Sequence, residues 1–217
     1  MTFPRIELDS RLLREYARLQ GWDVPQGGRA FIWAVRNGVL YPYGSGRVIE
    51  VRQGIPDQWD DTIGLAGTVW GMYQGTTDPG ARFAKRPMNP KGTAWVTPGV
   101  HKFRVGHHKR PRFLAPNALV QDGPMWIRRD RDRDGRPTDS DGPRTHEDTG
   151  IHIHEGGSVL RPVGPWSAGC LVLPREEWRG SPGREGFWPM VQAAKQQEWD
   201  LLLIDGLLLL EYVKKRA

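Results

Sequence analysis

The chain of 217 residues is long enough to bury one hydrophobic core, and its one cysteine excludes an intramolecular disulfide. Its 27 glycines and 18 prolines favour a turn-rich β architecture over a helical bundle. The formal net charge of +6 favours anionic partners such as nucleic acid or a cell wall. Because the basic residues are scattered, no nucleic-acid site is predicted.

The first half of the chain begins with a helical pattern and then changes to strands. Residues 10–20 place Leu12, Leu13, Tyr16 and Leu19 on one side of a helix, and Gly21 follows as a stop. Short apolar or alternating runs come next, separated by Gly and Pro clusters. They predict strands at residues 31–35, 62–66, 99–105 and 113–120.

The second half adds two short helices and a terminal hairpin. Pro174 suits the first turn of one helix, and residues 189–197 predict another. An Asp205-Gly206 turn between apolar residues 199–204 and 207–213 predicts a hairpin. We therefore predict one mainly β domain with short peripheral helices over residues 30–217, preceded by an N-terminal helix and linker over residues 1–29.

No membrane or export signal is expected. The first residues lack a basic start followed by an apolar stretch, so no signal peptide is predicted. The apolar tail is interrupted by Asp200, Asp205 and Glu211 and is too short to span a bilayer. A target outside the cytoplasm would then require delivery by another route, as for a phage component or a delivered effector.

The cysteine has neighbours that suit a nucleophile. Cys170 follows Ser167, Ala168 and Gly169, and these small residues allow a substrate carbonyl to approach closely. Backbone N–H groups around Gly169 and Cys170 are the candidates for an oxyanion hole. A lone cysteine is also common as a small buried apolar residue. The context favours catalytic use in acyl transfer.

Two histidines precede the cysteine. His152 and His154 alternate along a predicted strand, so both side chains should lie on the same side. One can serve as the base for the thiol and the other can contact substrate. The alternative is a zinc pair completed by Cys170, Glu155 or His146. Because no further His/Cys grouping supports it, neither a metal nor another cofactor is predicted.

These motifs resemble the catalytic domain of the L,D-transpeptidase family, also called the YkuD type. In that family a histidine precedes a Ser/Thr-His-Gly-Cys motif by about fourteen to seventeen residues; here fifteen residues separate His154 from Cys170, and Ser167 and Gly169 match. The resemblance implies a β-sandwich or barrel in which Cys170 attacks an amide of a peptidoglycan stem peptide and His154 is the base. The chain departs from the pattern at Ala168, where the family has histidine, and at Glu155, where it has glycine.

The expected function is therefore a peptidoglycan-acting cysteine enzyme that forms a thioester acyl-enzyme. Transpeptidation and hydrolysis both remain open, as does the oligomeric state. Trp166, Glu155 and Ala168 are the expected substrate contacts: Trp166 adjoins the Ser-Ala-Gly-Cys run and can wall the pocket, and Glu155 can bind an amine of the stem peptide. The alternative is a non-catalytic wall-binding or phage structural module that retains the fold, and the loss of the inner histidine at Ala168 favours it.

An acidic run upstream of the histidines imitates a calcium loop. The run begins at Asp130, has Asp132, Asp134 and Gly135 at its third, fifth and sixth positions, and has Asp141 rather than glutamate at the twelfth. Pro137, the nearby arginines and the lack of flanking helical patterns favour a solvated loop of alternating charge instead. We expect this loop to lie beside the active site, because it leads directly into the histidine strand.

Overall fold

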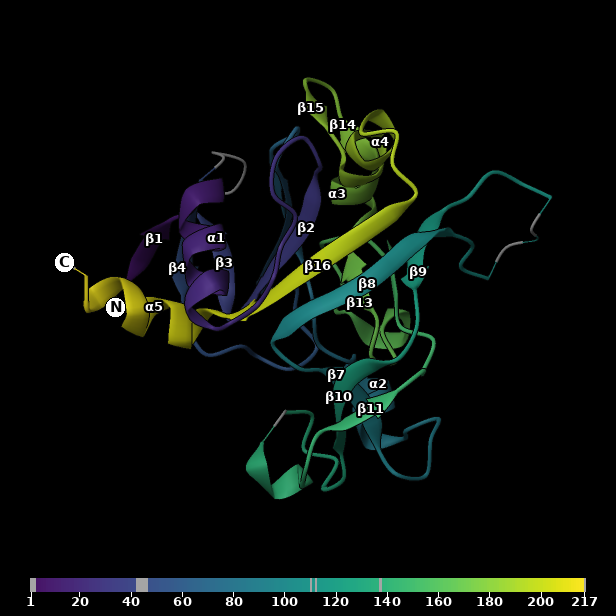
Figure 1. Ribbon diagram of the computed structural model, residues 1–217. Helices are drawn as coiled ribbons and strands as arrows, with labels where there is room; N and C mark the ends of the chain where they lie inside the picture. The colour runs from purple at the N-terminus through teal and green to yellow at the C-terminus, as the bar shows by residue number, and fades with distance from the viewer. Residues whose placement is uncertain (1–2, 42–46, 110, 112, 137, 217) are drawn as a thin grey trace.

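The computed structural model describes residues 3–41, 47–109, 111, 113–136 and 138–216 (Figure 1). It is a mainly β protein with short helices, as predicted. Eight strands form the main sheet in the order β13 (Leu171–Leu173), β12 (His152–Glu155), β9 (Ala118–Gln121), β8 (Gly99–Gly106), β16 (Glu198–Asp205), β2 (Phe31–Arg36), β5 (Asp61–Ala66) and β6 (Gly71–Gly75).

The main sheet closes on itself into a nearly complete barrel. Thr76, directly after β6, exchanges two backbone hydrogen bonds of 2.9 Å with Val172 of β13. The β12–β13 and β16–β2 pairs are parallel, and the other neighbours are antiparallel. This contact satisfies the backbone N–H and carbonyl of Val172 in an edge strand, which would otherwise be open to pairing with another chain.

Smaller elements surround the barrel. Two three-stranded sheets and a short hairpin lie outside it, in the orders β1 (Arg5–Glu7), β4 (Val48–Val51), β3 (Gly38–Tyr41); β11 (Thr145–Glu147), β10 (Met125–Asp130), β7 (Thr93–Val96); and β14 (Gly180–Ser181), β15 (Arg184–Glu185). The helices are α1 (Ser10–Leu19), α2 (Ala81–Lys85), α3 (Arg175–Arg179), α4 (Phe187–Ala193) and α5 (Gly206–Lys214), with short 3₁₀ turns η1 (Asp139–Asp141) and η2 (Gly164–Trp166).

Two hydrophobic clusters lie on opposite faces of the main sheet, and β2 contributes to both. Ile32 and Ala34 join one cluster, while Phe31, Trp33 and Val35 join the other, as the alternation of a strand requires. The second cluster is completed by apolar residues of α1, α5 and the β1–β4–β3 sheet. Both faces of β2 are therefore covered, which explains why its sequence is apolar at five of six positions instead of alternating.

Most predicted elements of the first half are confirmed. The helix at residues 10–19 begins after Asp9, whose side chain accepts a hydrogen bond from the Leu12 N–H at 2.7 Å. Strands β2, β5 and β8 lie where they were predicted. The strand predicted at residues 113–120 is confined to Ala118–Gln121, and Phe113 is exposed. The helix predicted at residues 189–197 runs from Phe187 to Ala193.

The predicted terminal hairpin is wrong. β16 is followed by α5, and the Asp205 side chain accepts a hydrogen bond from the Leu207 N–H at 2.8 Å, so Asp205 caps a helix instead of forming a turn. The reason is topological: β16 is already paired with β8 on one side and β2 on the other. A following strand would have no free edge of β16 to pair with.

The described residues contain no helix of the length and apolar character that a membrane span requires.

Candidate active site

The parallel pair β12–β13 brings the histidine and cysteine motifs together. Ile153 pairs with Leu171 and His154 with Val172, and continuing this register places His152 beside Cys170. Ile153 and Leu171 point into the first hydrophobic cluster. His152, His154 and Cys170 therefore share the opposite face of the two strands.

Cys170 is partly buried and its sulfur is held by the backbone. The His152 N–H donates a hydrogen bond to Sγ at 3.4 Å, and within the described residues no imidazole donates one. The side chain packs against a small cluster that includes Trp59 and Val163. Burial raises the pKa of the Cys170 thiol, and the His152 N–H opposes that rise. The resting side chain is a neutral thiol.

The turn before the cysteine is held rigidly by Ser167 and Gly169. The buried Ser167 hydroxyl donates to the Cys170 carbonyl at 2.8 Å and accepts from the Gly169 N–H at 3.3 Å. Gly169 has φ +119°, and a Cβ there would lie 2.5 Å from the Ala94 carbonyl oxygen, so only glycine fits. The Gly169 N–H is engaged within this turn and is therefore not free for the predicted oxyanion hole.

His154 has a defined tautomer and a vacant ring nitrogen. Its Nδ1 lies 2.7 Å from the Glu155 carbonyl oxygen, which can only accept, so Nδ1 carries the hydrogen and Nε2 is the acceptor. Nε2 is buried and has no hydrogen-bond partner among the described residues. Burial, helped by His108, lowers the pKa of His154 to about 3. The imidazole is therefore a neutral base with an unused acceptor.

A third histidine, outside the predicted motifs, joins the first two. His108 follows β8; its ring stacks on His154 with centroids 3.8 Å apart, and its Nδ1 lies 2.8 Å from Nδ1 of His152. Burial and the neighbouring His152 lower the pKa of His108 to about 4, and burial lowers the pKa of His152. Lys109 adds a positive field to this group. The only sequence signal was the His107-His108-Lys109 run at a strand end.

The three expected substrate contacts have different surroundings. The Glu155 carboxylate is engaged by Arg179 at 2.8 Å and by Arg175 at 3.4 Å, both on α3. Trp166 lies in η2, and its indole is 43% exposed, so it can contact a ligand. Ala168 is half-buried between Ser167 and Gly169.

The zinc alternative finds no support in the described part of the chain. His146 lies on β11, in another sheet, with its ring 4.9 Å from that of Trp126. The described residues contain one group of three or more possible ligands whose atoms are mutually within 4.8 Å, and it is made of aspartates. The cysteine and the histidines of β12 are not part of it.

A cavity of about 420 Å³ opens beside the histidines. His152 lines it together with His107 and with Gln121 of β9. His152 therefore connects the cavity with the group of histidines.

No family model, curated protein or solved structure matches this chain. The interpretation of the site therefore rests on its own residues and their geometry.

Proposed function

We propose that the protein is a cysteine-dependent acyl transferase or peptidase of the L,D-transpeptidase type that acts on peptidoglycan stem peptides at the cell wall. One observation carries the proposal: the Cys170 thiol shares a strand face with neutral imidazoles, and one of these, His154, has a fixed tautomer and a vacant Nε2. A nucleophile that is neutral at rest needs such an acceptor for its proton.

The reaction would proceed in two stages. Sγ turns from the His152 N–H toward the His154 ring, the thiol proton passes to Nε2, and Sγ bonds to the carbonyl carbon of the scissile amide. The tetrahedral intermediate collapses as the C–N bond breaks, and the imidazolium returns its proton to the leaving amine. A thioester remains on Cys170. Water then releases an acid, or an amine acceptor forms a new amide, and the thiol is regenerated.

The electrostatics favour proton transfer that is concerted with attack. The pKa of Cys170 is raised and that of His154 is lowered to about 3, so an ion pair of thiolate and imidazolium is disfavoured before substrate binds. The positive field of Lys109 acts in the opposite direction on the sulfur, because it stabilises the developing negative charge. Reactivity should therefore depend on bound substrate more than on pH.

The substrate class is supported by the motif, and acyl transfer by the geometry. Ser167, Gly169 and Cys170 match the family pattern, with fifteen residues between His154 and Cys170. Ser167 and Gly169 together fix the conformation of the turn that precedes the Cys170 thiol. The net charge of +6 suits an anionic wall polymer.

A second candidate is a non-catalytic wall-binding or phage structural module with the same fold. The hydrogen bonding of Cys170 favours it: within the described residues the sulfur is bonded to a backbone N–H and not to an imidazole. Ala168 stands where the family has its inner histidine. A thiol used only for packing would have this neutral, partly buried character.

The deciding experiment is intact-mass measurement of the protein incubated with purified muropeptides, followed by chromatography of the products. We expect wild type to gain an acyl adduct, or to release cleaved or crosslinked products, and Cys170→Ser to do neither. His146→Gln is the matched control, because this histidine lies in another sheet. Equal turnover by Cys170→Ser would exclude the covalent mechanism. Muropeptide binding without adduct or product would support the non-catalytic module.

A further inference from the structure

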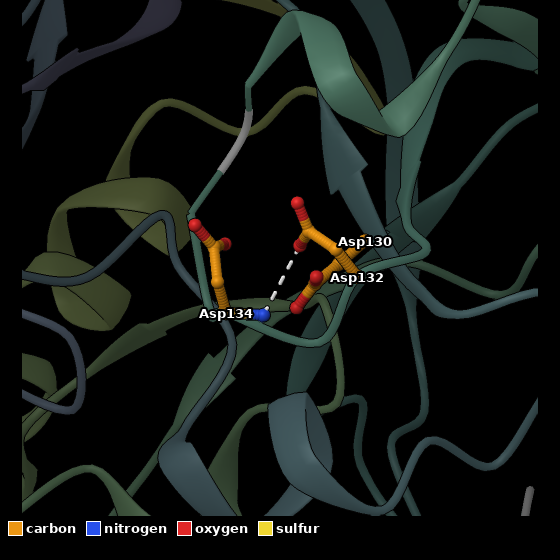
Figure 2. Close-up of side chains that lie close together, drawn as sticks. All are labelled: Asp130, Asp132 and Asp134. Carbon is orange, nitrogen blue, oxygen red and sulfur yellow. Dashed lines mark hydrogen bonds between the residues drawn. The ribbon is translucent and has the colours of Figure 1, made fainter.

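The acidic loop between β10 and β11 is mostly exposed, as the sequence predicts, but the aspartates at its two ends are not. Asp130 and Asp141 are both completely buried, and Asp132 and Asp134 are exposed. One oxygen of Asp130, of Asp132 and of Asp134 lies within 4.8 Å of the others. Figure 2 shows these three side chains around one small space, with a hydrogen bond from the Asp134 N–H to the Asp132 carboxylate.

Asp130 supplies the observation that points to a ligand. Its Oδ2 accepts a hydrogen bond from the Gly135 N–H at 3.1 Å, but its Oδ1 is buried and has no hydrogen-bond partner among the described residues. A buried carboxylate oxygen without a partner is costly, and a bound cation would remove that cost.

The ends of the loop are tied together by Asp141. Its two carboxylate oxygens accept hydrogen bonds of 2.9 Å from the Arg131 N–H and the Thr138 N–H. The Arg131 guanidinium packs beside Gly142. The acidic group is therefore preorganised by the backbone, so that a cation would not have to gather the ligands itself.

We propose that the loop from Asp130 to Asp141 is a calcium site in which Asp130, Asp132 and Asp134 supply the carboxylate ligands. The donor set is entirely oxygen, which suits a hard cation and not zinc or copper. Calcium accepts six to eight oxygen ligands in flexible geometry, whereas magnesium requires a smaller and nearly octahedral set. Asp141 has a shorter side chain than the usual glutamate and binds backbone N–H groups, so we expect a Kd of about 10⁻⁵ to 10⁻³ M.

The test uses the full chain, freed of metal by EDTA and dialysed, and titrated calorimetrically with CaCl₂ or MgCl₂. We expect saturable calcium binding at one site per chain and magnesium binding at least tenfold weaker. Calcium at one hundred times Kd should raise Tm by about 5–10 °C. Absence of both heat and a Tm shift at 10 mM CaCl₂ would overturn the proposal, as would equal affinity for the two cations.

Variants separate this site from general binding of cations by acidic residues. Asp132→Asn and Asp134→Asn change exposed side chains and should weaken calcium binding at least tenfold without unfolding the protein. Asp130→Asn tests the buried ligand but can disturb folding, so its result is interpreted only beside the other two. Asp148→Asn, an exposed aspartate outside the loop, is the matched control and should bind like wild type. Unchanged affinity in Asp132→Asn and Asp134→Asn would overturn the assignment.

Discussion

The cysteine–histidine face of β12–β13 and the Asp130 loop share one feature, a buried polar atom without a hydrogen-bond partner among the described residues. In the first region that atom is Nε2 of His154, and in the second it is Oδ1 of Asp130. The two groups respond to burial differently. An imidazole becomes neutral by losing its proton, and its lowered pKa leaves a base. A buried carboxylate is instead compensated by a proton or by a bound cation.

A buried polar atom without a hydrogen-bond partner can therefore indicate either a base or a cation site. Burial disfavours charge in both regions. His154 becomes uncharged when it loses its proton and is then a proton acceptor, whereas the Asp130 carboxylate stays negative unless a proton or a cation compensates it. In both regions the backbone holds the group in place: the Glu155 carbonyl fixes the His154 ring, and the Gly135 N–H fixes one oxygen of Asp130. The vacant atom is then available to a proton or to a cation.

The largest expected effect is on the acylation rate, and it distinguishes the roles of His152 and His154 on β12. His154→Gln retains a donor for the Glu155 carbonyl but replaces the basic ring nitrogen with an amide that cannot take up the thiol proton, so the acylation rate should fall about 10³-fold. His152→Gln leaves the backbone N–H that binds the sulfur and should cost about tenfold. Single-turnover acylation measured by mass spectrometry gives both rates. A greater loss in His152→Gln would make His152 the base.

Calcium affinity tests whether the cysteine–histidine face and the Asp130 loop act independently. His154→Gln should bind calcium as wild type does, because the imidazole belongs to β12 and the aspartates to the loop after β10. Joint loss of acylation and calcium binding in this variant would mean that the two regions act as one unit.

Acid titration tests the neutral imidazole. The folded pKa of His154 is about 3, against about 6.5 when unfolded, so the unfolded chain binds more protons between these values. The free energy of unfolding should therefore decrease as pH falls through this window. The contribution of His154 between pH 7 and pH 4 is roughly 3 kcal/mol. Urea unfolding of wild type and His154→Gln in EDTA should show a shallower pH dependence in the variant, and parallel curves would contradict the buried neutral state.

A glycine pair tests the turn that presents the thiol. Gly169→Ala places a Cβ 2.5 Å from the Ala94 carbonyl oxygen at φ +119°, and should lower the free energy of unfolding by about 3 kcal/mol. Gly150 also has a positive φ, of +71°, but has nothing within 4 Å of a built Cβ, so Gly150→Ala should cost only about 1 kcal/mol. Thermal or urea unfolding measures both losses. Equal losses of stability in the two variants would show that the close approach of Gly169 to Ala94 does not matter.

The smallest effect concerns Glu155. Its two arginine partners on α3 are mostly exposed, so Glu155→Gln should lower the free energy of unfolding by about 0.5 kcal/mol. Urea unfolding at low and high salt measures this loss, which salt should diminish. A fall in muropeptide affinity with unchanged stability would instead assign the carboxylate to substrate binding.

Parts of the candidate site were predictable because they depend on local patterns. The alternation of His152 and His154 gave their common side, and the small residues before Cys170 indicated a constrained turn. His108 was not predictable, because it comes from a loop more than forty residues earlier in the chain. Only the pairing of β9 with β8 and β12 brings that loop to the histidines.

The sequence by itself determined the mainly β class, the first helix and the central strands, because the periodicity and the helix cap there are local properties. Tertiary structure decided the rest. The apolar residues after Asp205 form a helix because both edges of β16 are taken. Asp130 is buried although its neighbours along the chain are charged, because β10 carries it against β7. Strand pairing and burial are set by residues far apart in sequence, so no local pattern can report them.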